Sequence, residues 1–168
     1  MFDITCFSKS YDVRRMSEPD ISPMLSLCEG NPQYYQYCPP AVSAENLKAD
    51  LEALPPGMTL KDKYYVGYFK DGCLIALLDL IEGFPDSSRT FIGFFMMDYM
   101  ASGAGIGSQI IEELCQYLLS AGIAAVRLGW VAGNPQAEHF WKKNGFIETG
   151  VKSKTEAYTI VLAERTLK

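Results

Sequence analysis

The stretch that decides the fold lies just past the middle of the chain: Met97-Asp98-Tyr99-Met100-Ala101-Ser102-Gly103-Ala104-Gly105-Ile106-Gly107-Ser108. An almost continuously apolar run, Ile92–Met97, precedes it, as is typical of a central strand buried on both faces. Apolar residues at helical spacing follow from Ile106 to Leu119, and Gly122 ends the helix. Strand, glycine loop and helix in this order favour an anion-binding cradle, because glycines admit a pyrophosphate and the first N–H groups of the helix point at it. From these residues alone, a tight strand-to-helix turn is the alternative.

The regions on either side contain the remaining strands of one mixed sheet and the helices that cover it, so the expected fold class is α/β (α+β). We expect a strand at Tyr11–Met16, a helix capped by Ser17, and a second helix over Ser43–Leu54. Two further strands, Tyr64–Phe69 and Cys73–Ile81, flank Asp71-Gly72, which is a strong hairpin signal. The remaining predicted elements are strands Thr90–Met97 and Ala124–Val131, a helix over Pro135–Asn144, and a closing β pair at Phe146–Val151 and Ala157–Leu162. This order predicts helices on both faces of the sheet.

Length and charge restrict the class of protein. A chain of 168 residues suits one domain, and a net charge of −5 argues against nucleic-acid binding. One histidine and five scattered cysteines favour neither a metal site nor a disulfide framework. No signal peptide is evident, and no apolar stretch reaches the roughly 18 residues of a membrane helix. We therefore expect a cytoplasmic protein with no membrane partner.

A second motif follows the next predicted strand: Asn134-Pro135-Gln136-Ala137-Glu138-His139-Phe140-Trp141-Lys142-Lys143-Asn144-Gly145-Phe146. It resembles the GNAT superfamily pattern of Asn, two residues, Ala, an aromatic and a later Gly-Phe. Gly105 and Gly107 likewise stand in the glycine places of the family's Gln/Arg-x-x-Gly-x-Gly/Ala loop. The resemblance covers about residues 89–150, which would be the acetyl-CoA-binding core of a single domain spanning 1–168. Helices at about 17–57 would lie on the substrate side.

The resemblance implies that two adjacent parallel strands splay apart and that acetyl-CoA lies in the slot between them. It implies that backbone groups near Phe95 and Met97 hold the pantetheine and polarise the thioester. Asn134 would bind the cofactor from the other lip, and Trp141 would pack beside the thiol. The pyrophosphate would be held by the loop residues Ser102, Gly103, Ala104, Gly105, Ile106, Gly107 and Ser108.

Three positions depart from the family pattern. Ser102 replaces the usual Gln or Arg and Ala104 a commonly basic residue, so we expect weaker side-chain contact with the phosphates. Trp141 stands where many relatives have the Tyr that protonates the departing thiolate, and an indole N–H donates hydrogen bonds without transferring a proton near neutral pH. A thiol of pKa about 8.5 can also leave unprotonated. Trp141 as a packing residue is the alternative.

An amine acceptor requires a base, because an alkylamine of pKa about 10 is protonated at pH 7. The candidates are Asp79, within an apolar run, and Glu82, at the end of the same predicted strand. The alternative for either is an ordinary surface or hydrogen-bonded carboxylate. The aromatic segment Asn31–Pro40, with Tyr34, Tyr35 and Tyr37, is a candidate for lining the acceptor site.

These observations predict an N-acetyltransferase that moves the acetyl group of acetyl-CoA to a primary amine of a small molecule or peptide. The attack would be direct, in a ternary complex, with no metal. The alternatives are a longer acyl group and a catalytically weak CoA-binding sensor. The sequence does not identify the acceptor, and it leaves a homodimer open.

Overall fold

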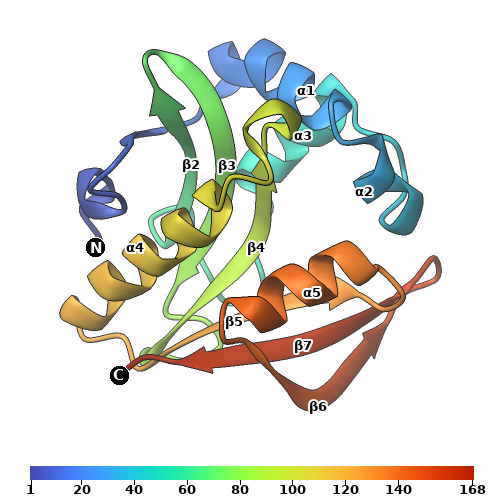
Figure 1. The fold of residues 1–168 in the computed structure, drawn as a ribbon. Helices are drawn as coiled ribbons and strands as arrows, with labels where there is room; N and C mark the ends of the chain where they lie inside the picture. Colours follow the sequence, from blue (N-terminus) through green and yellow to red (C-terminus); the bar gives the residue numbers. More distant parts are fainter.

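Seven strands form one mixed sheet, in the order β1-β2-β3-β4-β5-β7-β6 (Figure 1). A computed structural model describes all 168 residues. The strands are β1 (Asp12–Arg15), β2 (Lys63–Lys70), β3 (Cys73–Glu82), β4 (Arg89–Met97), β5 (Ala125–Val131), β6 (Ile147–Lys154) and β7 (Thr159–Thr166). Every neighbouring pair is antiparallel except β4 and β5. The predicted fold class, a mostly antiparallel mixed sheet with one parallel pair, is confirmed.

Five α-helices connect the strands: α1 (Ile21–Glu29), α2 (Pro32–Tyr37), α3 (Ala44–Glu52), α4 (Ile106–Ser120) and α5 (Pro135–Lys143). Three short 3₁₀ turns span Ile4–Cys6, Glu18–Asp20 and Tyr99–Ala101. The Ser17 cap was predicted to open α1 directly, but it forms a capping box with Asp20 around the 3₁₀ turn, and α1 begins after that. Helix α2 was not predicted, because six residues starting at a proline carry no helical apolar period.

The helices cover both faces of the sheet, as predicted, with α4 and α5 on one side and α1 and α3 on the other (Figure 1). On the first side, called the α4 face, Ile110, Ile111 and Leu114 pack against strand residues such as Leu78. On the second side, called the α1 face, Met24 and Leu47 pack against Leu77. No helix combines the length and apolar character needed to cross a membrane.

The β2–β3 hairpin turns at Asp71 and Gly72, with φ angles of 51° and 77°. Positive φ at both central residues is the requirement of a type I′ turn, whose twist matches the flanking strands. The predicted hairpin is therefore confirmed. The closing strand β7 runs to Thr166, four residues beyond the predicted end at Leu162, because it pairs with the whole length of β5.

Strand β4 differs from its prediction. A β-bulge at Gly93 separates Ile92, which pairs with Leu80, from Phe94, which pairs with Asp79. The bulge reverses the alternation of side chains: Ile92 belongs to the core of the α4 face, whereas Phe94 packs against that of the α1 face. The prediction that Ile92–Met97 is buried on both faces is wrong for most of the run, because Gly93 is exposed and Phe94, Phe95 and Met97 are only half-buried.

Candidate functional site

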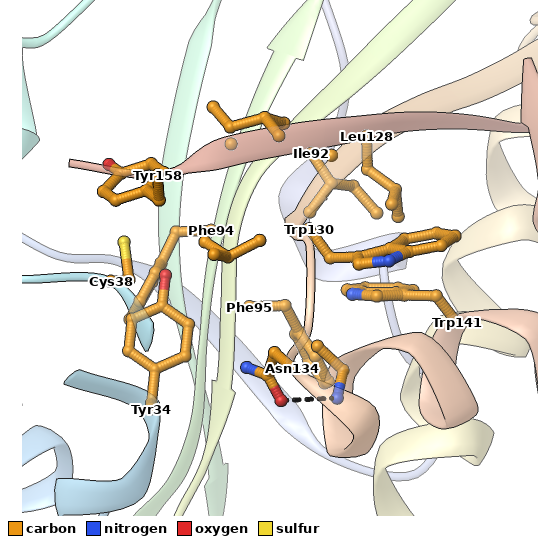
Figure 2. Close-up of a pocket in the computed structure, with 15 residues that line it drawn as sticks. Tyr34, Cys38, Ile92, Phe94, Phe95, Leu128, Trp130, Asn134, Trp141 and Tyr158 are labelled. Atoms are coloured by element: carbon orange, nitrogen blue, oxygen red, sulfur yellow. Dashed lines mark hydrogen bonds between the residues drawn. The ribbon is translucent and has the colours of Figure 1, made fainter. Parts of the chain in front are cut away.

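A slot opens between β4 and β5 because these strands pair over only part of their length. Their pairing runs from Arg89 with Ala125 to Ile92 with Leu128 and stops there. Beyond this point the strands border a pocket of about 180 Å³, shown in Figure 2. Its fifteen lining residues are Tyr34, Cys38, Ile92, Gly93, Phe94, Phe95, Leu128, Gly129, Trp130, Val131, Asn134, Ala137, Trp141, Tyr158 and Ile160.

Backbone groups of β4 face this slot. Asp98 lies opposite Ile75 of β3, and its N–H donates to the Ile75 carbonyl at 2.8 Å, so these two facing residues form a hydrogen-bonded pair. Opposed pairs alternate along an antiparallel ladder, so Phe95 and Met97 turn their N–H and C=O groups away from β3. Strand β5 pairs with neither residue. These groups can therefore hydrogen-bond an extended ligand lying in the slot, although Asn31 Nδ2 already donates to the Met97 carbonyl at 3.0 Å.

The glycine loop continues from the end of β4. Gly103 and Gly105 have φ angles of 86° and 79°, and a side chain built on either would meet nothing within 4 Å. None of the backbone N–H groups from Gly103 to Ser108 donates to a protein acceptor. Six free donors at the N-terminus of a 15-residue helix suit an anionic group such as a pyrophosphate.

Close packing fixes the start of α4 beside α5. A Cβ on Gly107 would lie 3.2 Å from a ring carbon of Phe140 and 3.4 Å from the Met97 side chain. Glycine at this position therefore lets the helix approach the end of β4 closely. Ser102, the residue in the place of the family's Gln or Arg, donates its hydroxyl to the carbonyl of Tyr99 at 2.7 Å.

Asn134 and Trp141 lie on the opposite lip of the slot. The Oδ1 atom of Asn134 accepts from the Ala137 N–H at 3.1 Å and caps α5, as the dashed line in Figure 2 shows. Its Nδ2 has no protein acceptor, so the same side chain still offers one donor to the pocket. The Trp141 ring is 8% exposed and packs against Phe95 and Phe146, with centroid distances of 5.9 and 5.2 Å.

Aromatic residues from three parts of the chain form the other end of the pocket. Tyr34 comes from α2, Phe94 from β4, and Tyr158 from the turn between β6 and β7. Tyr34 meets Phe94 edge to face at 5.8 Å. Burial raises the pKa of Tyr34 well above its usual value, and the neighbouring Cys38 together with burial raises the pKa of Tyr158. Both hydroxyls therefore stay neutral around pH 7.

The sequence segment Asn31–Pro40 thus contributes Tyr34 and Cys38 to the pocket, whereas Tyr35 packs beside α1-face residues. Phe94 and Trp130 pack against the cores of the α1 face and the α4 face, respectively, and both also line the pocket. Sequence reasoning missed Tyr158 and Ile160. They reach the slot only because β7 pairs with β5, and no local sequence motif predicts this pairing.

The first base candidate, Asp79, lies beside the slot. Its Oδ2 atom is 2.8 Å from Lys63 Nζ, and its buried Oδ1 atom has no hydrogen-bond partner. A Cβ added to Gly93 would lie 2.8 Å from Oδ2, so the carboxylate occupies the space left by the missing side chain of a pocket-lining residue. Burial raises the pKa of Asp79, and the charge of Lys63 opposes that effect.

The second candidate, Glu82, is the last residue of β3. It pairs with Thr90, in the region where β4 and β5 are still joined. Its two oxygens accept from the Met1 amino group at 3.0 Å and from the Tyr64 hydroxyl at 2.6 Å. Of the two carboxylates, only Asp79 adjoins a residue that lines the pocket. The structure brings together no group of three or more His, Cys, Asp or Glu side chains that could hold a metal ion.

Comparison with known proteins assigns the family. The model of the Acetyltransferase (GNAT) family matches residues 28–146, and the chain therefore belongs to this family. No curated protein sequence matches the chain significantly.

Solved structures share the fold at low sequence identity. An acetyltransferase from Thermus thermophilus has a TM-score of 0.76 at 19% identity, covering 94% of this chain and 97% of its own. The ribosomal-protein-S18-alanine N-acetyltransferase of Escherichia coli has a TM-score of 0.69 at 12% identity, covering 94% of both chains. The PaiA N-acetyltransferase of Thermoplasma acidophilum, in complex with coenzyme A, has a TM-score of 0.66 at 18% identity, covering 94% of this chain and 99% of its own.

Proposed function

We propose that this protein transfers the acetyl group of acetyl-CoA to a primary amine, by direct attack in a ternary complex. The observation that carries the proposal is the continuity of the slot with the glycine loop. The backbone groups of Phe95 and the N–H of Met97, which no neighbouring strand pairs, lead directly to six free N–H groups at Gly103–Ser108. An extended pantetheine followed by a pyrophosphate needs hydrogen-bonding groups in this order.

Acetyl-CoA supplies an activated acyl group as a thioester. In the proposal, Phe95 and Met97 hold the pantetheine through their backbone, and the loop from Ser102 to Ser108 holds the pyrophosphate. Asn134 Nδ2 donates to the cofactor from the opposite lip. The closely packed rings of Phe95, Phe140 and Trp141 fill the α4 face of the slot and favour an acetyl group over a longer acyl chain.

The acceptor nitrogen must lose its protons to attack and to leave a neutral amide. We assign the proton acceptor to Asp79, because its place behind Gly93 puts a carboxylate with one unpartnered oxygen next to the proposed reaction site. The departing thiolate needs no acid near pH 8, since a thiol of pKa about 8.5 is then partly ionised in water. Trp141 can still donate its indole N–H to the sulfur.

A base with a raised pKa sets the direction of the pH dependence. Activity requires ionised Asp79, so turnover should rise as the pH rises through the pKa that burial has raised. Asp79→Asn should lower turnover about 10²- to 10⁴-fold at saturating acetyl-CoA, whereas Glu82→Gln is the matched control. Turnover of both variants should be measured from pH 6 to 9 after their folding has been checked. Near-normal turnover of Asp79→Asn across that range would rule out this role.

Binding is tested separately from transfer. Acetyl-CoA at about 100 times its dissociation constant should stabilise the fold by roughly 2.7 kcal/mol. For a chain of this size that is about 5–10 °C in melting temperature. NAD and ATP at equal concentration should have much smaller effects. No shift with millimolar acetyl-CoA would refute the proposed function. A shift without CoA release on any amine would instead favour the CoA-binding sensor, which the replacement of the usual Tyr by Trp141 also suggests.

A further inference from the structure

The acceptor end of the pocket contains no side chain that could pair with a second charge. Its walls are the rings of Tyr34, Phe94 and Tyr158 together with Cys38 and Ile160. No Asp, Glu, Lys, Arg or His lines the pocket at all. The neighbouring carboxylate of Asp79 lies behind Gly93 and is already paired with Lys63.

Two glycines determine which side chains border this end of the slot on the α1 face. Gly93 and Gly129 are the first residues of β4 and β5 beyond the last paired positions. Cβ atoms built on them would lie 2.8 Å from Asp79 Oδ2 and 2.5 Å from Ile160 Cγ2, so these two side chains occupy the space next to the glycines. An acceptor at the end of the paired region therefore meets Asp79 and Ile160 there, and no side chain of β4 or β5 at these positions.

The walls are also well fixed. Phe94 is held between Tyr34 and Tyr65, with ring centroids at 5.8 and 6.4 Å. The whole pocket, including the part assigned to the cofactor, measures about 180 Å³, which is already smaller than the roughly 300–1,000 Å³ typical of pockets for drug-sized ligands. Aromatic faces attract an amine cation and bury an apolar body, but a second charge would lose its water without gaining a partner.

Resting on the proposed function, we propose that the acceptor is a small amine with an apolar or aromatic body whose only charge is the amine that becomes acetylated. Polyamines, diamines and basic peptides then fit poorly. In the transfer, the ammonium form first loses one proton to water; the N–C bond then forms as the C–S bond breaks, the second proton passes to Asp79, and CoA leaves as the thiolate.

A matched pair of acceptors tests the inference on the wild-type protein. Hexylamine and pentane-1,5-diamine have equal chain length and differ by a terminal methyl in place of a terminal ammonium. CoA release should give a kcat/KM at least about tenfold higher for hexylamine, since a tenfold change corresponds to only about 1.4 kcal/mol. 2-Phenylethylamine should be used at least as well as hexylamine, and spermidine and an alanine-starting tetrapeptide poorly.

A variant pair tests whether the pocket walls cause the preference. Tyr158 lies in the β6–β7 turn and is only half-buried, so substitutions there are tolerable. Tyr158→Glu should supply the missing partner and lower the hexylamine-to-diamine ratio at least about tenfold, whereas Tyr158→Gln should leave the ratio within about threefold. Both variants must keep the acetyl-CoA thermal shift, which verifies their fold.

The outcomes separate the two proposals. A kcat/KM for pentane-1,5-diamine, spermidine or the peptide that equals that for hexylamine would overturn this inference. The proposed acetyltransferase activity would still stand. Equal hexylamine-to-diamine ratios in folded Tyr158→Glu and Tyr158→Gln would show that the pocket wall does not cause the preference. Acetyl-CoA binding without transfer to any amine would overturn the proposed function, and this inference with it.

Discussion

The two halves of the β4–β5 pair contrast sharply although they belong to the same strands. In the closed half, from Arg89 to Ile92 and from Ala125 to Leu128, the strands pair residue by residue. Thr90 and Val126 are fully buried there. In the open half, from Gly93 to Met97 and from Gly129 to Val131, no pairing occurs and the strands border the pocket.

The contrast shows how one strand pair can provide both stability and a binding site. Glu164 of β7 accepts from Arg89 Nε at 3.0 Å and from Arg127 Nε at 2.9 Å, so charged side chains also tie the closed half together. In the open half, hydrogen-bonding groups of β4 are left for a ligand. Changes in the open half should therefore alter binding and turnover, and changes in the closed half should alter stability.

The largest expected effect concerns the loop that continues the open half. Gly105→Val should abolish the thermal shift with acetyl-CoA, a loss of about 2.7 kcal/mol of ligand stabilisation. A β-branched side chain opposes the φ of 79° and projects into the space that the pyrophosphate would need. The measurement is melting temperature with and without acetyl-CoA.

Gly57 offers a matched control for that substitution. Its φ is 83°, and a side chain built on it also meets nothing within 4 Å, but it lies between α3 and β2. Gly57→Val should carry a similar backbone strain and keep the full shift. If acetyl-CoA raises the melting temperature of Gly105→Val as much as that of Gly57→Val, the loop does not bind the cofactor.

A smaller effect is expected at the other lip of the open half. Asn134→Ala should raise the Michaelis constant for acetyl-CoA about fivefold, because losing one neutral hydrogen bond costs on the order of 1 kcal/mol. It should also cost about 1 kcal/mol of stability, since Asn134 caps α5. Steady-state kinetics and denaturant unfolding measure the two effects.

Asn134→Ser separates capping from cofactor binding. Serine can still cap a helix but lacks the amide donor that faces the pocket. We expect this variant to recover most of the stability and to keep the raised Michaelis constant. A normal Michaelis constant in Asn134→Ser would assign Asn134 to capping alone.

The smallest effect should appear in the closed half. Burial tends to raise the pKa of Glu164, but hydrogen bonds from Arg89 and Arg127 lower it overall. Its stabilising contribution is therefore present above the ordinary pKa of about 4.3 and disappears as the pH falls through the lowered value. Glu164→Gln should cost about 0.5–1 kcal/mol at pH 7, since these side chains are partly exposed, and progressively less below about pH 4.

The same variant should leave the Michaelis constant for acetyl-CoA within about twofold of wild type, because the partly exposed ion pairs of Glu164 at the closed end contribute to stability and do not border the slot. Urea unfolding at pH 7 and pH 3, together with steady-state kinetics, would measure both quantities. A Michaelis constant that changes as much as in Asn134→Ala would refute the division of the two strands into separate halves.

The sequence carried the information for much of the fold because the relevant signals are local. The Asp71-Gly72 turn, the helical period of α4 and the two loop motifs each lie within a short stretch, and the structure places all of them as predicted. Asp79 could be singled out because a carboxylate within an apolar strand is unusual. Its partner Lys63 could not, since only strand pairing brings the two side chains together.

Features that depend on tertiary arrangement were missed. Helix α2 is held by tertiary contacts, including the hydrogen bond from Asn31 to Met97, rather than by an apolar period of its own. Tyr158 reaches the pocket only through the path of β7 beside β5. Burial of β4 was overestimated because an apolar run does not indicate where a neighbouring strand departs.

The bulge at Gly93 has a consequence for how the chain can change in length. Gly93 is the extra residue of the bulge, so deleting it would leave Ile92 and Phe94 as successive residues on opposite faces, still opposite Leu80 and Asp79. Every later side chain of β4 would then keep its present face. Deleting Phe95 instead would move Met96 and Met97 to the opposite faces. A single-codon deletion at position 93 should therefore cost less stability than one at position 95.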